Sequence, residues 1–249
     1  MKAFLISTIL IFLLIVSLSS TQKISVNVGE VLRAEVSDIE YNSSVDGIFK
    51  IRFQLYNSGS TGYKARARLD VFNDSELVFT GWSEEKSFIP GTRETFSLYW
   101  LPPQKGRFLA KLRVYYADEI EKIKTIRVEV KNVTSLLKNF EITDLKTYSD
   151  EIKFKLKSNK SLKNVLIIPS DYPLGWVFEQ KRIEKIDKDE IKDITLGYKP
   201  SLWKPSGITL KIVTEDGKYA SSEHFSLKRV SPIEEFFHQF FKLLLSIIL

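Results

Sequence analysis

Side chains that commonly carry out catalysis or hold metal ions are scarce in this 249-residue chain. It has no cysteine, which excludes disulfides, thiolate metal sites, cysteine nucleophiles and lipidation on cysteine. It has only two histidines, His224 and His238, so a histidine-rich metal site or a Ser-His-Asp triad has almost nothing to draw on. His224 lies among Ser221, Ser222 and Phe225 in a strand-like stretch, where we expect a structural role.

The carboxylates show no catalytic or metal-binding pattern. The segment Asp187-Lys188-Asp189-Glu190 lacks the spaced oxygen ligands and the glycine of a calcium loop, which favours a solvated turn. Glu84-Glu85 and Asp118-Glu119 are adjacent pairs, and neighbouring side chains on a strand point to opposite faces. No Gly-rich phosphate loop and no Gly-x-Ser-x-Gly elbow is present. We therefore expect a protein that is not an enzyme, with no catalytic, cofactor-binding or metal-binding residues and no cofactor.

Two sets of residues are candidates for binding. The lysines Lys153, Lys155 and Lys157 share one face of a strand, and they either contact anionic groups or keep that face soluble and unpaired. Aromatic rings exposed in loops bind sugars by stacking, whereas a tryptophan of a β-sandwich is usually buried. We expect Trp100 in the core and keep Trp176 and Trp203 as candidates for glycan stacking.

The charge and the asparagines indicate a solvated surface. The formal net charge of +6 is spread over 37 basic and 31 acidic side chains, so both signs are abundant and nucleic-acid binding is not expected. The many Lys, Glu and Ile residues with a single Met resemble thermophile usage, which predicts high thermal stability. Asn-x-Ser/Thr sequons, the candidates for glycosylation in an exported protein, occur at Asn42, Asn73, Asn132 and Asn159.

The N-terminus has the layout of a secretory signal. Lys2 is followed by a mostly apolar run from Ala3 to Leu18 and then by small polar residues. A helix of about 16 residues spans roughly 24 Å, less than the ~30 Å hydrocarbon core of a bilayer. Residues 1–20 are therefore interpreted as a cleaved signal peptide, with an uncleaved signal anchor as the alternative. Both place the remaining chain outside the cytoplasm.

The C-terminus, residues 232–249, predicts an amphipathic helix. Ser231-Pro232-Ile233-Glu234 is a capping box with proline at the first helical position. The apolar face, spaced at i, i+3, i+4 and i+7, consists of Ile233, Phe236, Phe237, Phe240, Phe241, Leu244 and Ile248. Three interpretations stay open: the helix lies in a membrane interface, inserts as a marginal tail anchor, or buries its face against a partner chain or neighbouring domain.

Between these ends the chain alternates with a period of two residues. Apolar residues recur at every second position in the stretches 49–55, 63–71 and 108–114. Short turns separate them, and no helical stretch interrupts them. This succession is typical of an antiparallel β-sandwich.

The same pattern recurs about 100 residues later. Glu35-Val36-Ser37-Asp38-Ile39 corresponds to Glu141-Ile142-Thr143-Asp144-Leu145, and two further landmarks follow in the same order. The period is that of one immunoglobulin-sized unit, which predicts a tandem duplication. We place the two modules at 23–131 and 136–229 and expect them to sit end to end with limited bending.

The first module resembles a known family over residues 34–117. The motifs are Leu55-Tyr56-Asn57-Ser58-Gly59-Ser60, Ile89-Pro90-Gly91, Leu98-Tyr99-Trp100-Leu101-Pro102 and Gly106-Arg107-Phe108. This order resembles the cell-adhesion-related domain (CARDB) of bacterial and archaeal surface proteins. The resemblance implies an immunoglobulin-like fold and a role in surface display or adhesion. The second module departs from it, with Ser158-Asn159-Lys160 at the turn and no Pro-Gly corner, and is described only as a fibronectin- or immunoglobulin-like sandwich.

The sequence thus predicts an all-β protein of two tandem immunoglobulin-like sandwiches, flanked by a signal or anchor helix and an amphipathic helix. The expected function is that of an exported, membrane-tethered cell-surface or envelope protein acting in adhesion, spacing or assembly. Its expected partners are the membrane and other envelope proteins or surface glycans. The alternatives are a carbohydrate-binding accessory module and an extracytoplasmic subunit of a membrane complex that docks through its C-terminal helix.

Overall fold

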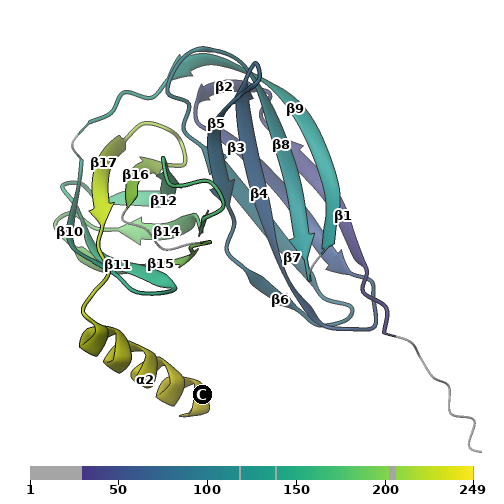
Figure 1. Ribbon diagram of the computed structural model, residues 1–249. Coiled ribbons are helices and arrows are strands. Elements are labelled where there is room, and N and C mark those ends of the chain that lie inside the picture. Colours follow the sequence, from purple (N-terminus) through teal and green to yellow (C-terminus); the bar gives the residue numbers. More distant parts are fainter. Residues whose placement is uncertain (1–29, 118, 138, 202–205, 249) are drawn as a thin grey trace, which may run out of the picture. The chain divides into compact units, whose positions relative to one another are not determined.

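The computed structural model describes residues 30–117, 119–137, 139–201 and 206–248, without the side chains of 119–123 and 247–248 (Figure 1). Within this part, Val31–Leu249 forms one compact unit. The predicted signal or anchor at residues 1–20 and the candidate Trp203 lie outside the described residues.

The first sandwich extends from residue 34 to residue 133 (Figure 1). Its strands are β1 (Ala34–Tyr41), β2 (Ser44–Gly47), β3 (Phe49–Asn57), β4 (Tyr63–Asn73), β5 (Glu76–Trp82), β6 (Lys86–Phe88), β7 (Arg93–Trp100), β8 (Gly106–Tyr116) and β9 (Glu119–Val133). One sheet has the order β1-β3-β7, and the other has the order β2-β9-β8-β4-β5 with β6 paired to β4. Every second residue of β3 is buried, from Phe49 to Leu55, so the predicted alternation marks the core-facing positions.

The second sandwich extends from residue 140 to residue 227. Its strands are β10 (Phe140–Thr147), β11 (Glu151–Ser158), β12 (Leu162–Ser170), β13 (Val177–Phe178), β14 (Lys181–Ile186), β15 (Ile191–Lys199), β16 (Ser206–Thr214) and β17 (Ala220–Leu227). The two sheets have the orders β10-β11-β15-β13 and β14-β12-β16-β17. The helix α2 (Pro232–Ile248) follows. The predicted all-β class with two sandwiches and a C-terminal helix is confirmed.

The two sandwiches share the details of their first hairpin. β1 pairs with β3 from Ala34↔Asn57 onward, and β10 pairs with β11 from Phe140↔Ser158 onward. Both ladders shift register after the fourth pair, between Ser37 and Glu40 and between Thr143 and Lys146. Asp38 and Asp144 lie at these bulges with φ values of 50° and 54°. The repeat noticed in the sequence is therefore a repeat of backbone conformation.

Two of the motifs that resemble CARDB bind each other. Asn57 N–H donates to Thr92 O at 3.0 Å, and Gly91 N–H donates to Asn57 O at 2.9 Å. The Asn57 side chain closes its own turn by accepting from Gly59 N–H at 3.0 Å and donating to Thr61 O at 2.9 Å. A Cβ on Gly59 would lie 2.1 Å from Val31 O, so only glycine fits. These motifs hold the fold together.

The second sandwich makes the same turn with different residues. Asp189 N–H donates to Ser158 O at 2.8 Å, as Gly91 does to Asn57 in the first sandwich. Ser158 Oγ donates to Lys160 O at 2.7 Å and thereby closes the turn. The left-handed position of the Pro-Gly corner is filled by Asp189, with a φ of 61°. The corner that the sequence lacks is present in the structure.

Apolar and polar contacts join the two sandwiches. The core of the first sandwich includes Leu166, Ile168, Val213 and Ala220 of the second. The Gln180 side chain donates to Tyr99 O at 2.7 Å and accepts from Tyr99 N–H at 2.8 Å. The modules placed at 23–131 and 136–229 therefore each have a core of their own, and four residues of the second sandwich pack into the core of the first.

One strand pair departs from the expected antiparallel pattern. β2 runs parallel to β9, from Ser44↔Glu129 to Gly47↔Val133. The chain then turns at Gly47, whose φ of 100° is open to glycine, and enters β3 in the other sheet. Four residues are too few for alternation to identify such a strand.

Candidate functional site: the C-terminal helix and the turn that holds it

The helix α2 begins as the sequence predicts. Ser231 Oγ accepts a hydrogen bond from Glu234 N–H at 3.2 Å, and Pro232 occupies the first helical position. The second half of the predicted capping box differs, because the Glu234 carboxylate binds Lys146 Nζ at 2.6 Å. A residue expected to close the helix on itself thus connects it to β10.

The polar face of α2 docks on the turn between β10 and β11. Glu235 Oε1 accepts from Ser149 Oγ at 2.7 Å and from Ser149 N–H at 3.2 Å. Gln239 Nε2 donates to Ser149 Oγ at 2.9 Å, and Lys242 Nζ lies 2.5 Å from Asp150 Oδ2. These bonds span two turns of the helix and fix its orientation on the second sandwich.

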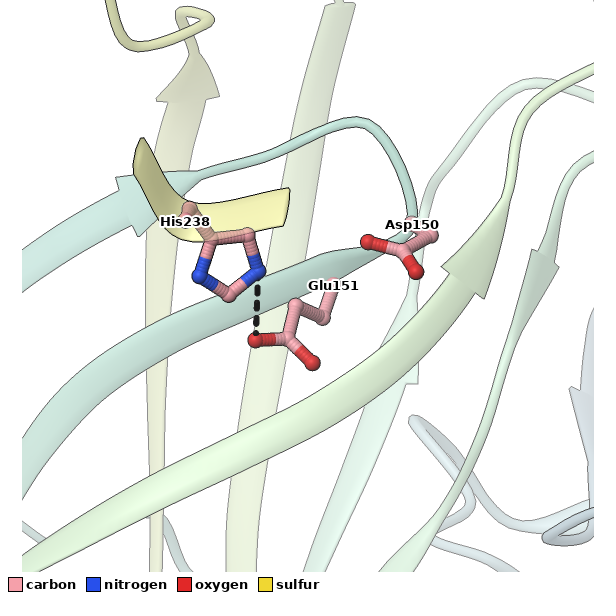
Figure 2. Close-up of side chains that lie close together, drawn as sticks. All are labelled: Asp150, Glu151 and His238. Carbon is pink, nitrogen blue, oxygen red and sulfur yellow. Dashed lines mark ion pairs between the residues drawn. The ribbon is translucent and has the colours of Figure 1, made fainter. Parts of the chain in front are cut away.

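His238 lies at the centre of this contact (Figure 2). Its ring packs on the Tyr148 ring with centroids 4.0 Å apart, and its Nε2 lies 3.1 Å from Glu151 Oε1. The side chains of His238 and Glu151 are 12% and 13% exposed. Figure 2 shows Glu151 on its strand beneath the helix, with Asp150 in the adjoining turn. We refer to Tyr148, Ser149, Asp150 and Glu151, with their partners on α2, as the polar dock.

The polar dock contains a possible set of metal ligands. One ligand atom each from Asp150, Glu151 and His238 lies within 4.8 Å of the others. Lys242 Nζ, however, is 2.5 Å from Asp150 Oδ2 and 3.6 Å from Glu151 Oε2. Because the Lys242 ammonium group already pairs with both carboxylates, the arrangement fits an ion-pair network better than a metal centre.

The network shifts the protonation of its members. Burial alone would raise the pKa of Asp150, but its hydrogen bond and ion pair with Lys242 hold that pKa below its ordinary value. Burial would also raise the pKa of Glu235. The hydrogen bonds from Ser149 and Gln239 outweigh this effect, so the pKa of Glu235 is lowered. Burial lowers the pKa of Lys242, but the carboxylates of Asp150 and Glu151 raise it by more, so its pKa is raised. Asp150, Glu235 and Lys242 are therefore charged at neutral pH.

The apolar face of α2 is exposed. Eight large apolar side chains are between 40% and 70% exposed: Ile233, Phe236, Phe237, Phe240, Phe241, Leu243, Leu244 and Leu245. The helix does contact the neighbouring sandwich, but it does so with its polar face. The interpretation that the apolar face is buried against a neighbouring domain is therefore wrong for the described residues; the side chain of Ile248 lies outside them.

None of the helices in the described part of the chain combines the length and apolarity needed to cross a bilayer. Six residues of the predicted apolar face are exposed: Ile233, Phe236, Phe237, Phe240, Phe241 and Leu244. Leu243 and Leu245, which the prediction left out, widen this face. The sequence did not indicate the receiving segment Tyr148–Glu151, since a connection of three residues between two strands is typical of any hairpin. The signal that the sequence does offer is the run Ser149, Asp150 and Glu151, whose oxygens can accept hydrogen bonds from Gln239 and Lys242 of the helix.

The lysine stripe of β11 is neutralised. Lys153 pairs with Glu151 at 3.0 Å, Lys155 with Asp144 at 2.7 Å, and Lys157 with Asp189 at 3.4 Å. A further lysine of this group, Lys160, lies over the Tyr219 ring at 4.6 Å. The stripe keeps its solvent-facing side chains but offers little uncompensated charge for an anionic ligand.

The tryptophans are mostly structural. Trp100 is 1% exposed in the first core, as predicted. Trp176 is 2% exposed and packs against Phe178 and Tyr198, with ring centroids 6.0 Å and 5.9 Å away. The prediction that Trp176 is a glycan-stacking platform is therefore wrong, because its ring is buried in the second core and cannot present a face to a sugar.

The sequon asparagines differ in exposure. Asn132 and Asn159 are exposed, and Asn73 is half-buried beside the β4–β5 turn. The Asn42 side chain holds its own loop, since its Nδ2 donates to Ile48 O at 2.9 Å and its Oδ1 accepts from Lys50 N–H at 2.8 Å. A glycan on Asn42 would have to replace these bonds.

Other residues singled out in the sequence lie in structural positions. His224 is exposed on β17, with Nδ1 3.2 Å from Thr209 Oγ1. The Asp187–Glu190 segment is a turn closed by Asp187 N–H donating to Glu190 Oε2 at 2.7 Å. Glu85 pairs with Lys64 at 3.3 Å and with Lys199 at 2.9 Å.

The fold and the docked helix define an all-β protein of two sandwiches with a terminal amphipathic helix. No protein-family model matches the sequence, and no match is found among curated proteins. Among solved structures, the chain is similar to a CARDB domain from Pyrococcus furiosus in complex with di-metal ions. The identity is 17% and the TM-score 0.30, over 41% of this chain and 93% of that one. The resemblance to CARDB suggested by the sequence is thus also found by structure.

The chain is also similar to a transglutaminase of red sea bream. The identity is 9% and the TM-score 0.29, over 80% of this chain. The chain spans about a third of the transglutaminase, 32% of its length. Likenesses at these identities and TM-scores transfer neither an activity nor a metal site.

Proposed function

We propose that this chain is an exported, non-enzymatic surface or envelope protein, attached to a membrane by α2. The observation that supports this proposal is the orientation of the helix. Its polar side chains bind the second sandwich, and its phenylalanines and leucines project away from it. An exposed apolar face of this size on a soluble protein is typical of an interaction site.

The same orientation distinguishes a tether from a packing element. A helix that only completes a core places its apolar face inward and its charges in water. Here the polar groups of Glu235, His238 and Lys242 contact the second sandwich and hold the helix against it. Its apolar face remains available for a membrane.

Export is supported by the N-terminal sequence. The charged Lys2, the apolar run to Leu18 and the small residues that follow are the parts of a secretory signal. The two sandwiches joined by Gln180 then act as a rigid spacer that displays their faces at a fixed distance from the lipid. The carbohydrate-binding alternative loses one of its two candidate residues, because Trp176 is buried, and then rests on Trp203 alone, which lies outside the described residues.

Cell fractionation of the full chain tests this proposal. We expect the protein in the membrane fraction, with its lysines accessible to a membrane-impermeant amine reagent on intact cells. Phe236→Ser with Phe240→Ser should shift it to the soluble fraction. The control, Ile89→Ser with Leu174→Ser, removes two equally exposed apolar side chains elsewhere and should not.

Two results would overturn the proposal. Wild-type protein in the cytosol would exclude export. Retention of the Phe236/Phe240 variant at the wild-type level, with residues 1–20 still present by mass spectrometry, would assign the tether to the N-terminal segment instead of α2.

A further inference from the structure

We infer that α2 lies flat in the interface of a single lipid leaflet, with the polar dock at the level of the headgroups. This inference rests on the membrane attachment proposed above and specifies its geometry. It makes the protein monotopic at its C-terminal end, and the second sandwich is then held directly against the membrane surface.

The distribution of side chains around the helix axis carries the inference. At about 100° per residue, Glu235, His238, Gln239 and Lys242, which contact the polar dock, fall within an arc of about 100°. The exposed apolar set, from Leu243 on one side to Leu245 on the other, covers an arc of about 200°. The two arcs lie on opposite sides of the helix.

An arc of this width favours lipid over a partner helix. A helix that packs on another helix buries a narrow stripe, whereas an interfacial helix is surrounded by lipid over its whole lower half. One charged residue, Glu234, falls within this arc at the first turn of the helix, and its carboxylate is paired with Lys146 at 2.6 Å. From Phe236 to Leu245 the arc carries no charged side chain, so hydrocarbon contact there leaves no charge unsatisfied.

The length of α2 and the polar dock both oppose an orientation that spans the bilayer. The 17 residues of α2 reach about 26 Å, which is short of the ~30 Å hydrocarbon core. Orientation along the membrane normal would also remove Glu235 and Lys242 from Ser149 and Asp150 and place two charges in hydrocarbon. The fixed contact therefore selects the flat orientation.

The absence of cysteine allows a clean measurement. Phe237→Cys and Leu244→Cys place a nitroxide at nearly the same angle around the axis, seven residues apart, on side chains that are 52% and 40% exposed. The full chain is reconstituted with phosphatidylcholine vesicles, and the depth of each label is obtained from its accessibility to oxygen and to a water-soluble nickel complex. Ser75→Cys, on the exposed β4–β5 turn, serves as the aqueous reference.

We expect both labels in the lipid at depths that agree within about 3 Å, because the axis of a flat helix is parallel to the surface. A depth difference near the 10 Å rise of seven residues would show an inserted, steep helix and overturn the inference. Labels shielded from both reagents and broadened by spin–spin coupling would show a second copy on this face, with the same consequence. Two labels in water, on a chain that still floats with vesicles, would overturn the proposed function too.

Loosening the polar dock provides a second readout. Lys242→Gln with Asp150→Asn removes the ion pair that holds the C-terminal half of α2. The Leu244 label should then move deeper than the Phe237 label by several ångströms. Lys155→Gln with Asp144→Asn breaks an exposed ion pair elsewhere on the second sandwich and should leave both depths unchanged. Unchanged depths in both double variants would contradict the role of the polar dock.

Discussion

At the scale of single residues, Asp38 and Asp144 show that the repeat is physical. Each occupies the left-handed region at the bulge of its first hairpin, where residues with a Cβ are strained. Aspartate tolerates this region better than most residues, because its short side chain bonds locally. Ser37 Oγ, for example, lies 3.4 Å from Asp38 Oδ2.

Substitutions at Asp38 should therefore separate backbone strain from side-chain loss. We expect Asp38→Ala to lower the free energy of unfolding by about 1 kcal/mol, since alanine keeps the Cβ and loses the local bond. Asp38→Gly should stay within about 0.5 kcal/mol of wild type, because glycine adopts this φ freely. Urea denaturation measures both. Equal losses for the two variants would show that strain at Asp38 is unimportant.

The polar dock should weaken in acid. Asp150 and Glu235 have lowered pKa values, so their contribution is complete above the ordinary carboxyl range and is lost as the pH falls through the lowered values. Lys242 has a raised pKa, so its contribution is present at neutral pH and is lost only as the pH rises through that raised value.

The amide of Ser149 reports this transition, because it donates to Glu235 Oε1. In an NMR titration its shift should change with a midpoint below 4.5, the ordinary value for a glutamate. The amide of Asp74, an exposed turn residue, is the control. A Ser149 midpoint at or above 4.5 would mean that Glu235 is not held by the polar dock in solution.

The sequence predicted the burial of residues that follow the alternation of a strand. It missed the burial of residues that depends on packing partners distant in the chain. Trp100 is the last residue of the strand β7 and continues the alternation of the buried Phe96 and Leu98, so its burial was predicted. Trp176 precedes a strand of two residues, Val177–Phe178, too short for any periodicity. Its burial arises from Phe178 and Tyr198, and Tyr198 lies 22 residues away in the chain.

At the scale of elements, the long strands and the helix could be predicted, while the short strands could not. The alternation in β3, β4 and β8 and the capping residue of α2 are local signals. The parallel pairing of β2 with β9 joins residues about 85 positions apart, such as Ser44 and Glu129, and no local pattern encodes it. The direction in which α2 faces was likewise undecided, because it depends on the turn Tyr148–Glu151.

Membrane binding by α2 should depend little on lipid charge. The stripe of Lys153, Lys155 and Lys157 is paired with carboxylates. Lys146 on β10 and Lys242 of the polar dock are paired as well. We expect the full chain to bind vesicles of phosphatidylcholine and vesicles with 30% phosphatidylserine equally within about threefold, since unpaired lysines each contribute about 1 kcal/mol to anionic lipid.

The triple variant Lys153→Gln, Lys155→Gln and Lys157→Gln checks this by vesicle flotation. It should bind both vesicles as wild type does, because the stripe offers no free charge to the lipid. A strong preference of wild type for phosphatidylserine that the triple variant loses would contradict apolar attachment and restore the stripe as a binding surface.

At the scale of the whole molecule, the two sandwiches should unfold together. Leu166, Ile168, Val213 and Ala220 belong to the second sandwich by sequence and to the first core by packing. Unfolding of one sandwich alone would expose the apolar surface that packs between them. It would also break the hydrogen bonds of the Gln180 side chain and leave the N–H and C=O of Tyr99 unpaired. The short joint in the sequence predicts limited bending, and the packing of these four residues is a further physical reason to expect it.

Gln180→Ala tests this coupling. The substitution leaves the buried N–H and C=O of Tyr99 without partners, which costs about 1–3 kcal/mol for each group. For a chain of this length we expect the melting midpoint of the single calorimetric transition to fall by about 4–12 °C. Gln54→Ala, which removes an exposed contact 3.3 Å from Arg93, should change the midpoint by no more than about 2 °C. Two resolved transitions in the wild-type protein would show instead that the sandwiches are independent, and a rigid spacer would then require a different explanation.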